Sequence, residues 1–233
     1  MDNIFYVPET DFNAGSSVEI KDQEAQHIGR VLRYQVGDII FIADGVGNHF
    51  ECEISSISKK AVSAIIIGKS STQEPIVKKV LALGVIKKRD RLEFAIEKAV
   101  ELGAWKIVLF NADHSERNRI NKERVEAQII SAFKQSGRFW LPELIILDST
   151  DEVYSHFENA EFLMAHVDTE LQQEPPSLSD GLTVLMVGPE GGFSFREKEL
   201  QLSKGGALVS LGVNRLRAET AVTVFLSQYL FSS

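Results

Sequence analysis

Beyond Pro75, short continuous apolar runs alternate along the chain with amphipathic stripes. Continuous runs are typical of buried strands, whereas apolar residues three and four apart mark one face of a helix. The runs predict strands at 80–86, 105–110, 143–148, 161–167, 182–188 and 207–212, and the stripes predict helices at 89–103, 121–137, 151–159 and 217–233. Strands that alternate with helices predict an α/β domain with a mainly parallel sheet and helices on both faces.

Two of the predicted helices carry boundary signals. Asp90 followed by Glu93 resembles a capping pair for the helix at 89–103, and Gly103 is a natural stop. Ser194 and Glu197 fit the S-x-x-E capping box, in which each residue bonds the other's backbone N–H. This second pair predicts one more helix, beginning at about Phe195.

The first seventy residues have a different pattern. Residues 37–67 form short β-rich runs broken by turn residues, and Asp44-Gly45 is a hairpin signal. Several short strands at this spacing indicate a small antiparallel barrel or sandwich. Residues 22–38 can hold a short helix that ends near Gly29 or Arg33. The small and polar stretch 68–75 reads as a linker, which gives domains at 1–70 and 75–233.

Composition narrows the class of protein. A single cysteine, Cys52, excludes an intrachain disulfide, and five scattered histidines lack the spacing of metal ligands, so no metal site is expected. The acidic N-terminus has no basic region followed by an apolar core, and no apolar run reaches transmembrane length. A cytoplasmic protein without membrane contact is the default expectation.

The net charge of −8 argues against general nucleic-acid binding, but the charges are segregated. Residues 139–195 contain eleven acids and neither lysine nor arginine, which leaves 25 bases against 22 acids elsewhere. Residues 78–91 alone hold six bases and one acid. A local basic surface is therefore compatible with an acidic total, although a charge run is more often simply a solvated face.

Candidate chemistry gathers at three predicted strand ends, 162–166, 184–192 and 208–220, because ligands of open α/β sheets bind at the carboxyl ends of strands. The stretch GPEGGF at 188–193 joins a strand to a helix, and its glycines allow a ligand to approach the backbone. It matches neither G-x-G-x-x-G nor a P-loop. A tight turn without a ligand, and a buried Arg–Glu pair that merely holds the loop at 212–220, remain open alternatives.

Together, VGPEGGFSFREKEL (187–200) and LGVNRLRAETA (211–221) closely resemble the 16S rRNA (uracil(1498)-N(3))-methyltransferase family. That family belongs to the SPOUT class of S-adenosylmethionine-dependent RNA methyltransferases. HIGRVLRYQVGDIIFIADG, KKRDRLEFAIEKAVELGA and KQSGRFWLPEL extend the likeness over nearly the whole chain. The resemblance implies a PUA-like RNA-binding β-barrel at 1–70 and a SPOUT domain with a trefoil knot at 75–233. It also implies a homodimer whose active site forms near the subunit boundary.

The resemblance and the strand ends together supply the expected site residues. Those expected to bind the cofactor S-adenosylmethionine are Met164, Ala165, His166, Gly188, Pro189, Glu190, Gly191, Gly192, Leu211, Gly212, Leu216, Arg217 and Thr220. Those expected to contact RNA, by charge and family position, are Arg30, Arg33, Lys87, Lys88, Arg89, Arg91 and Arg138. Arg217 is expected to orient or stabilise the target base, with Glu219 positioning it.

The chain departs from the family pattern at two places. It has no arginine in MDNIFYV at its start, and Ala218 stands where relatives commonly have threonine. The expected partner is 16S rRNA or the small ribosomal subunit, and the expected reaction is methylation of N3 of a uridine. The alternatives are a SPOUT methyltransferase with another RNA target and a non-catalytic RNA-binding factor.

Overall fold

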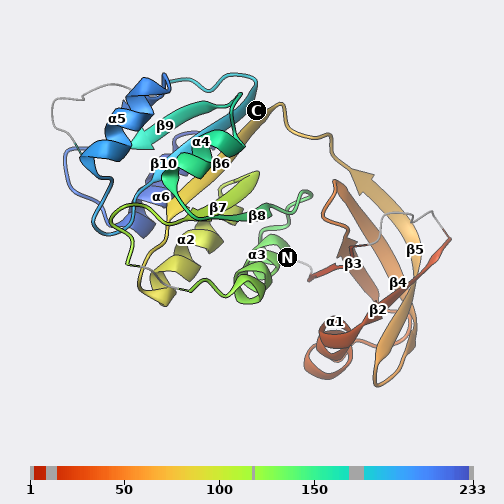
Figure 1. The fold of residues 1–233 in the computed structure, drawn as a ribbon. Coiled ribbons are helices and arrows are strands. Elements are labelled where there is room, and N and C mark those ends of the chain that lie inside the picture. The colour runs from red at the N-terminus through yellow and green to blue at the C-terminus, as the bar shows by residue number, and fades with distance from the viewer. Residues whose placement is uncertain (1–2, 9–14, 117–118, 168–175, 231–233) are drawn as a thin grey trace. The chain divides into compact units, whose positions relative to one another are not determined.

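The computed structural model describes residues 3–8, 15–116, 119–167 and 176–230 of the chain (Figure 1). The chain divides into two compact units. Unit 1 comprises Met1–Glu74 together with Phe133–Leu141, and unit 2 comprises Pro75–Ala132 together with Pro142–Ser233. The segment at 133–141, which the sequence places in the middle of the second domain, therefore packs with the N-terminal residues.

Unit 2 is built on a six-stranded sheet in which every pair of neighbours is parallel. Its strands, in the order in which they lie, are β11 (Ala207–Val209), β9 (Glu161–Ala165), β10 (Gly181–Val187), β6 (Val77–Gly84), β7 (Lys106–Phe110) and β8 (Glu143–Leu147). All six correspond to predicted apolar runs, which confirms the parallel α/β prediction. β9 and β11 end earlier than predicted, because residues 166–167 and 210–212 belong to loops.

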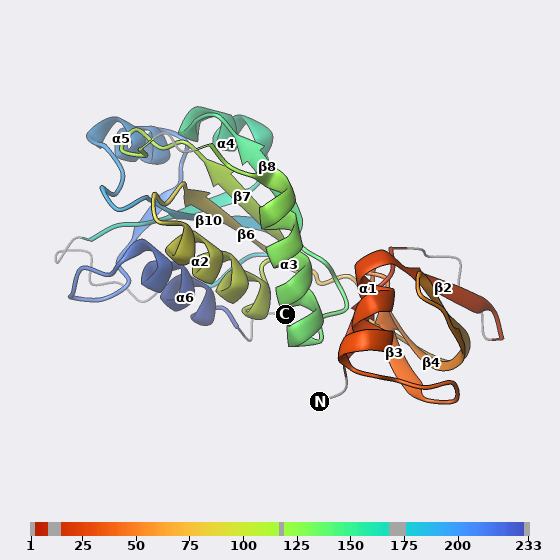
Figure 2. The same cartoon turned by 90° about the horizontal axis from the view of Figure 1, so that it is seen from below.

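Helices cover both faces of this sheet, as predicted (Figure 2). α2 (Arg89–Glu101) packs against α6 (Ala218–Ser227) on one face, and α4 (Thr150–His156) and α5 (Phe195–Ser203) lie on the other. Alternate strand residues explain the two faces: Val80, Val184 and Met186 join the buried cluster that includes Tyr154 of α4. The other helix that this part of the chain contributes among the described residues is α3 (Lys122–Ser136).

The helix boundaries test the predicted signals. The capping box of Ser194 and Glu197 is present and α5 begins at Phe195, so that prediction is confirmed. The capping role of Asp90 is wrong, because α2 begins one residue before it, at Arg89, and Lys88 is the N-cap without a side-chain bond. Gly103 follows the end of α2 with a φ of +85°, which favours glycine. α6 ends at Ser227, short of the predicted 233, and residues 231–233 lie outside the described residues.

Two fully buried polar residues anchor α5. The Glu197 carboxylate accepts hydrogen bonds from the backbone N–H groups of Ser194 (2.8 Å) and Asp113 (3.1 Å) and from the hydroxyl of Thr150. The Gln201 amide donates to the carbonyls of Phe162 (2.9 Å) and Ala207 (2.8 Å). Because these groups are desolvated but satisfied, they fix α5 against the connection that follows β7, the first residue of α4, and strands β9 and β11.

Unit 1 contains a curled five-stranded sheet in the order β1 (Ile4–Tyr6), β3 (Ile39–Ala43), β4 (Asn48–Ile57), β5 (Ala61–Ser71) and β2 (Ser17–Lys21). β3 and β4 form the hairpin predicted at Asp44-Gly45, and the Asp44 carboxylate accepts from the backbone N–H groups of Val46 and Asn48. The sheet is not wholly antiparallel as expected, because β1 pairs parallel to β3. Its inner side chains form a separate core that includes Phe50 and Cys52.

Other features of unit 1 refine the prediction. The short helix of 22–38 is α1 (Asp22–Gln26), continued by the π-helix η1 (His27–Val31). β5 runs to Ser71, so the first four residues of the predicted linker are strand. No helix in the described part of the chain is both long and apolar enough to cross a membrane.

We expect Glu197→Ala to lower the free energy of unfolding by about 3 kcal/mol, because three donors lose their acceptor in a dry site. Urea unfolding followed by circular dichroism measures this change. Glu199→Ala, an exposed position on the same helix, is the control and should change stability by less than about 0.5 kcal/mol. Equal effects of the two substitutions would contradict the anchoring role.

Cys52 reports on the core of unit 1. Burial, with the Glu51 carboxylate nearby, raises the pKa of its thiol to about 12, so the reactive thiolate is scarce at about pH 8. We expect a thiol-specific disulfide reagent to label the native protein at least about 100-fold more slowly than the urea-unfolded protein. Because Cys52 is the sole cysteine, fast labelling of the native protein would show that this core opens readily.

Candidate functional site

A cavity of about 620 Å³ lies in unit 2, beyond the carboxyl ends of β9 and β10. Its walls come from the ends of β9 and β10, the residues that follow each of them, the loop between β11 and α6, and the beginning of α6. Arg91 of α2 completes the lining. Ligands of open α/β sheets bind at such strand ends, and the volume is in the range of small-molecule sites. The cavity is therefore the candidate ligand site of unit 2.

Most residues predicted to bind a cofactor line this cavity. They are Ala165, His166, Gly188, Pro189, Glu190, Gly191, Gly192, Leu211, Gly212, Leu216 and Arg217. Met164 does not line it, because its side chain is fully buried in the core with Met186. Thr220 also lies outside the lining and is exposed on α6. Three loops that are far apart in sequence thus converge on one cavity.

The lining also includes residues that the sequence reading did not assign to the cofactor: Val167, Val187, Phe193, Asn214, Arg215, Ala218, Ala221 and, from the set expected to contact RNA, Arg91. Val187 and Phe193 flank the glycine loop and close the apolar side of the cavity. Ala221 lies three residues beyond Ala218, so the helical period could have placed it on the same face. No sequence signal pointed to Arg91 as a lining residue, because it comes from a distant helix.

The loop at 188–193 lies in close contact with neighbouring backbone. A Cβ at Gly84, the last residue of β6, would lie 2.6 Å from Cδ of Pro189. A Cβ at Gly191 would lie 2.8 Å from Cβ of His114. Gly192 has a φ of +69°, in the left-handed region that favours glycine. The loop is therefore rich in glycine for two reasons: a side chain at Gly191 would not fit, and the backbone conformation at Gly192 disfavours one.

Polar contacts hold the far end of this loop. Nδ1 of His114 lies 3.2 Å from the carbonyl oxygens of both Gly191 and Gly192, so a proton on Nδ1 donates to them. Arg196 donates to both carboxylate oxygens of Asp113, and the hydroxyl of Ser194 donates to the same group. These hydrogen bonds hold the pKa of the Asp113 carboxyl below its usual value. The connection after β7 therefore supports the loop from outside the cavity.

Charged residues occupy the opposite wall. Arg217 is the exposed N-cap residue of α6 and makes no side-chain capping bond. Glu219 is buried, and its Oε1 lies 3.5 Å from Nε of Arg91. Among the described residues, no ion pair joins Glu219 to Arg217, the partner expected from the sequence. Arg215 donates to the backbone carbonyl of Glu190 at 3.1 Å, which links the two loops across the cavity.

The residues expected to contact RNA fall in both units. Arg30, Arg33 and Arg138 belong to unit 1, and Lys87, Lys88, Arg89 and Arg91 belong to unit 2. All are exposed except Arg91 and Arg138, which are half-buried. Burial lowers the pKa of the Arg138 guanidinium to about 10, which leaves it charged at neutral pH. Arg33 has a φ of +58°, an uncommon backbone conformation for an arginine.

Both units match known families. Residues 72–230 match the family described as RNA methyltransferase domain, and residues 20–67 match the RNA methyltransferase PUA domain. The chain is 32% identical over 222 residues to ribosomal RNA small subunit methyltransferase E of Rickettsia conorii. That alignment covers 91% of this chain and 89% of the relative.

Two solved structures have the same fold. Ribosomal RNA small subunit methyltransferase E from Neisseria gonorrhoeae, bound to S-adenosylmethionine, superposes with a TM-score of 0.87 at 26% identity and covers 98% of this chain and 97% of its own. A methyltransferase from Legionella pneumophila, also with bound S-adenosylmethionine, gives 0.82 at 26% identity over 97% and 96%. The curled sheet of unit 1 accordingly belongs to a PUA domain, and the parallel sheet of unit 2 belongs to an RNA methyltransferase domain.

The close contact between Gly84 and Pro189 should make stability sensitive to a side chain at position 84. Gly84→Ala places a methyl group against the backbone and ring of Pro189, and overpacking of this kind costs about 1–3 kcal/mol. Gly68→Ala is the matched control, because its Cβ would meet only the Glu51 side chain, whose carboxylate oxygen lies 3.3 Å away. Thermal unfolding of the two variants measures the difference. A Gly84 variant as stable as the wild type would show that the loop moves aside freely.

Proposed function

Since the chain belongs to the RNA methyltransferase family of ribosomal RNA small subunit methyltransferase E, we propose that it methylates N3 of uridine 1498 in 16S rRNA. The methyl donor is S-adenosylmethionine, the molecule bound in the relatives from Neisseria and Legionella. The observation that carries the proposal is the convergence of both resemblance motifs, 187–200 and 211–221, on one cavity.

The residues present fit such a donor. A Cβ at Gly192 or Gly212 would meet no atom within 4 Å, so both glycines leave room beside the loops. The apolar lining of Val187, Phe193 and Ala221 suits an adenosyl group, and loop backbone groups are available for its polar edge. We propose that the residues at 188–192 and 211–217 hold the adenosyl group and that Ala165 and His166 close the cavity beside them.

The bound donor supplies an electrophilic methyl group on a sulfonium. The chain must bring uracil N3 into line with it, and alignment of this kind accounts for a large part of a rate enhancement. N3 lies on the pairing edge, so the chain must accept the base unpaired or flipped out. As N3 gives up its proton to solvent, negative charge develops on the ring, and a cation beside the ring stabilises it. Arg217 at the exposed wall is the residue we propose for this role.

We propose further features of the assembly. Unit 1 helps to hold the RNA, with Arg30, Arg33 and Arg138 as contacts, and Lys87, Lys88 and Arg89 contribute from the start of α2. Residues 1–70 form the RNA-binding domain and residues 75–233 the methyltransferase domain. The latter contains a trefoil knot, and two copies form a homodimer that acts in the cytoplasm on rRNA or the assembled small subunit. The family resemblance supports each of these statements.

One experiment separates this function from its alternatives. Small ribosomal subunits that lack the modification are incubated with the protein and labelled methyl donor, and the methylated base is mapped. We expect label at N3 of uridine 1498. Label at another nucleotide would indicate a different RNA target, and the absence of both label and donor binding would indicate a non-catalytic RNA-binding factor.

Arg217→Ala tests the role of the exposed arginine. We expect kcat to fall about 100-fold at saturating donor, because the developing charge on the base loses its cation. The KM for the donor should change less than about threefold, and Arg217→Lys should retain part of the activity. Lys204→Ala, an exposed substitution at the end of α5, is the control. Full turnover by Arg217→Ala would exclude this role.

A further inference from the structure

We propose that Arg91, held by Glu219, binds the carboxylate of the methionine part of the methyl donor and so selects donors that carry it. This inference rests on the proposed function, because it names one contact within the same cavity. Arg91 is the one described lining residue that α2 supplies, and every other described lining residue lies at or after the end of β9, or between the last residue of β10 and the second turn of α6. The sequence suggested Arg91 only as an RNA contact.

The Glu219 carboxylate contacts the Arg91 guanidinium at its Nε edge. Nε of Arg91 lies 3.5 Å from Oε1 of Glu219, and the side chain of Arg91 is 24% exposed. Neither terminal nitrogen of the guanidinium has a hydrogen-bond partner among the described residues. An arginine presents its donors as a planar fork that matches a carboxylate in two parallel hydrogen bonds. The two terminal nitrogens are therefore available to an anionic group in the cavity.

Glu219 is placed to fix that guanidinium. Its side chain is 11% exposed, and its Oε2 is buried without a partner among the described residues. It lies in the first turn of α6, where the helix dipole stabilises a carboxylate. α6 packs directly against α2, so Glu219 reaches Arg91 from a rigid neighbour. Glu219 is thus a positioning residue that acts through Arg91.

A carboxylate fits this position better than an RNA phosphate. Arg215 and Arg217 are exposed at the same cavity and can reach a macromolecule, whereas Arg91 is half-buried. As a half-buried residue that lines the cavity, Arg91 is accessible to a small ligand that enters it. Arg91 also lies in the first turn of the 13-residue helix α2, where the dipole favours an anion. The carboxylate is the one negatively charged group of S-adenosylmethionine, and a carboxylate can accept two parallel hydrogen bonds from a guanidinium.

The test compares two ligands by isothermal titration calorimetry on the full-length protein. One is S-adenosylmethionine, and the other is its decarboxylated analogue, which keeps the adenosyl group, the sulfonium and the amine. We expect the wild type to bind the analogue at least about tenfold more weakly, as loss of a charge-assisted pair predicts. The ratio that is compared is the dissociation constant of the analogue divided by that of S-adenosylmethionine. In Arg91→Ala this ratio should fall to near one, and in Arg91→Lys it should be intermediate.

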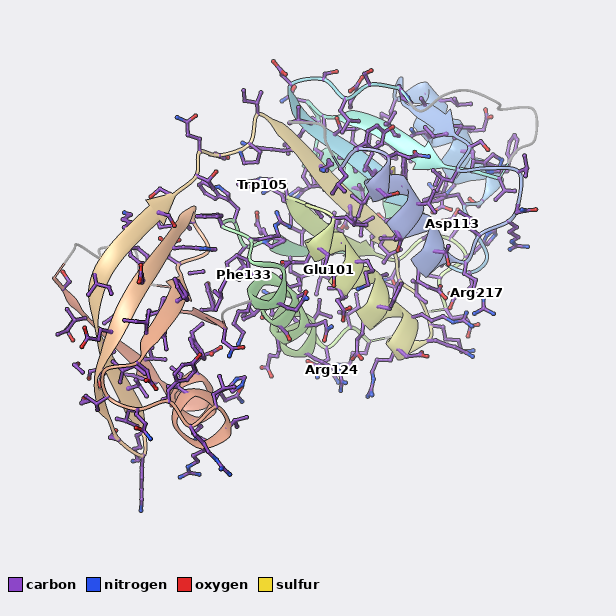
Figure 3. The ribbon with its side chains drawn as sticks, turned by 180° about the vertical axis from the view of Figure 1, so that it is seen from behind. Glu101, Trp105, Asp113, Arg124, Phe133 and Arg217 are labelled. Carbon is purple, nitrogen blue, oxygen red and sulfur yellow. The ribbon has the colours of Figure 1, made fainter. Side chains whose placement is uncertain are left out.

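Arg124→Ala is the matched control, because Arg124 also pairs with a glutamate, Glu93, but lies on α3 outside the cavity (Figure 3). Its ratio should equal that of the wild type. Glu219→Gln should lower the ratio less than Arg91→Ala does, because the guanidinium stays present but is held less firmly. A purely structural role for either residue would weaken both ligands equally and leave the ratio unchanged.

The outcomes are distinguishable. Equal binding of the two ligands by the wild type overturns this inference and leaves the proposed function intact, and this result needs no variant to fold. An unchanged ratio in a folded Arg91→Ala, together with a higher KM for small subunits, would assign Arg91 to RNA and overturn it as well. Failure of the wild type to bind either ligand would overturn the proposed function and the inference together.

Discussion

The candidate site depends on the hydrogen bonds that the buried carboxylate of Glu197 accepts. It accepts hydrogen bonds from Ser194, Asp113 and Thr150, which belong to three different segments. A desolvated carboxylate is stable only when its oxygens are satisfied, so these segments hold one arrangement. The glycine loop ends where this arrangement begins, and its course from β10 to α5 is therefore set at both ends.

Between those ends, the loop is shaped by the absence of side chains. Gly84 lets Pro189 lie against β6, and Gly191 lets the backbone lie against His114. Gly84 and His114 do not line the cavity, whereas Gly192 and Gly212 do, and a Cβ at either of these two would meet open space. Glycine thus permits close packing at positions 84 and 191 and leaves room for a ligand at positions 192 and 212. Figure 3 shows Asp113 and Arg217 at the same end of unit 2, one supporting this loop and the other lining the cavity.

The charged residues at the cavity differ in how they are held, and this difference is the basis of the separate roles that we propose for them. Arg91 is half-buried and paired with Glu219, whereas Arg217 is exposed and makes no capping bond. A guanidinium held by a buried carboxylate is suited to a small anionic ligand, whereas exposed arginines are accessible to a large substrate. A protein with a net charge of −8 can therefore act on RNA, because a few arginines at the cavity supply the local positive charge.

The sequence alone determined the parallel α/β class, the β-rich N-terminal unit, the hairpin at Asp44-Gly45 and the capping box at Ser194. Each of these depends on contacts within a few residues or on the period of apolar positions. The family motifs also indicated most of the cavity lining. Tertiary structure decided the pairing of Glu219 with Arg91, the support from His114, and the inclusion of residues 133–141 in unit 1. These contacts join residues far apart in the chain, and no local spacing encodes which distant helix or loop a side chain meets.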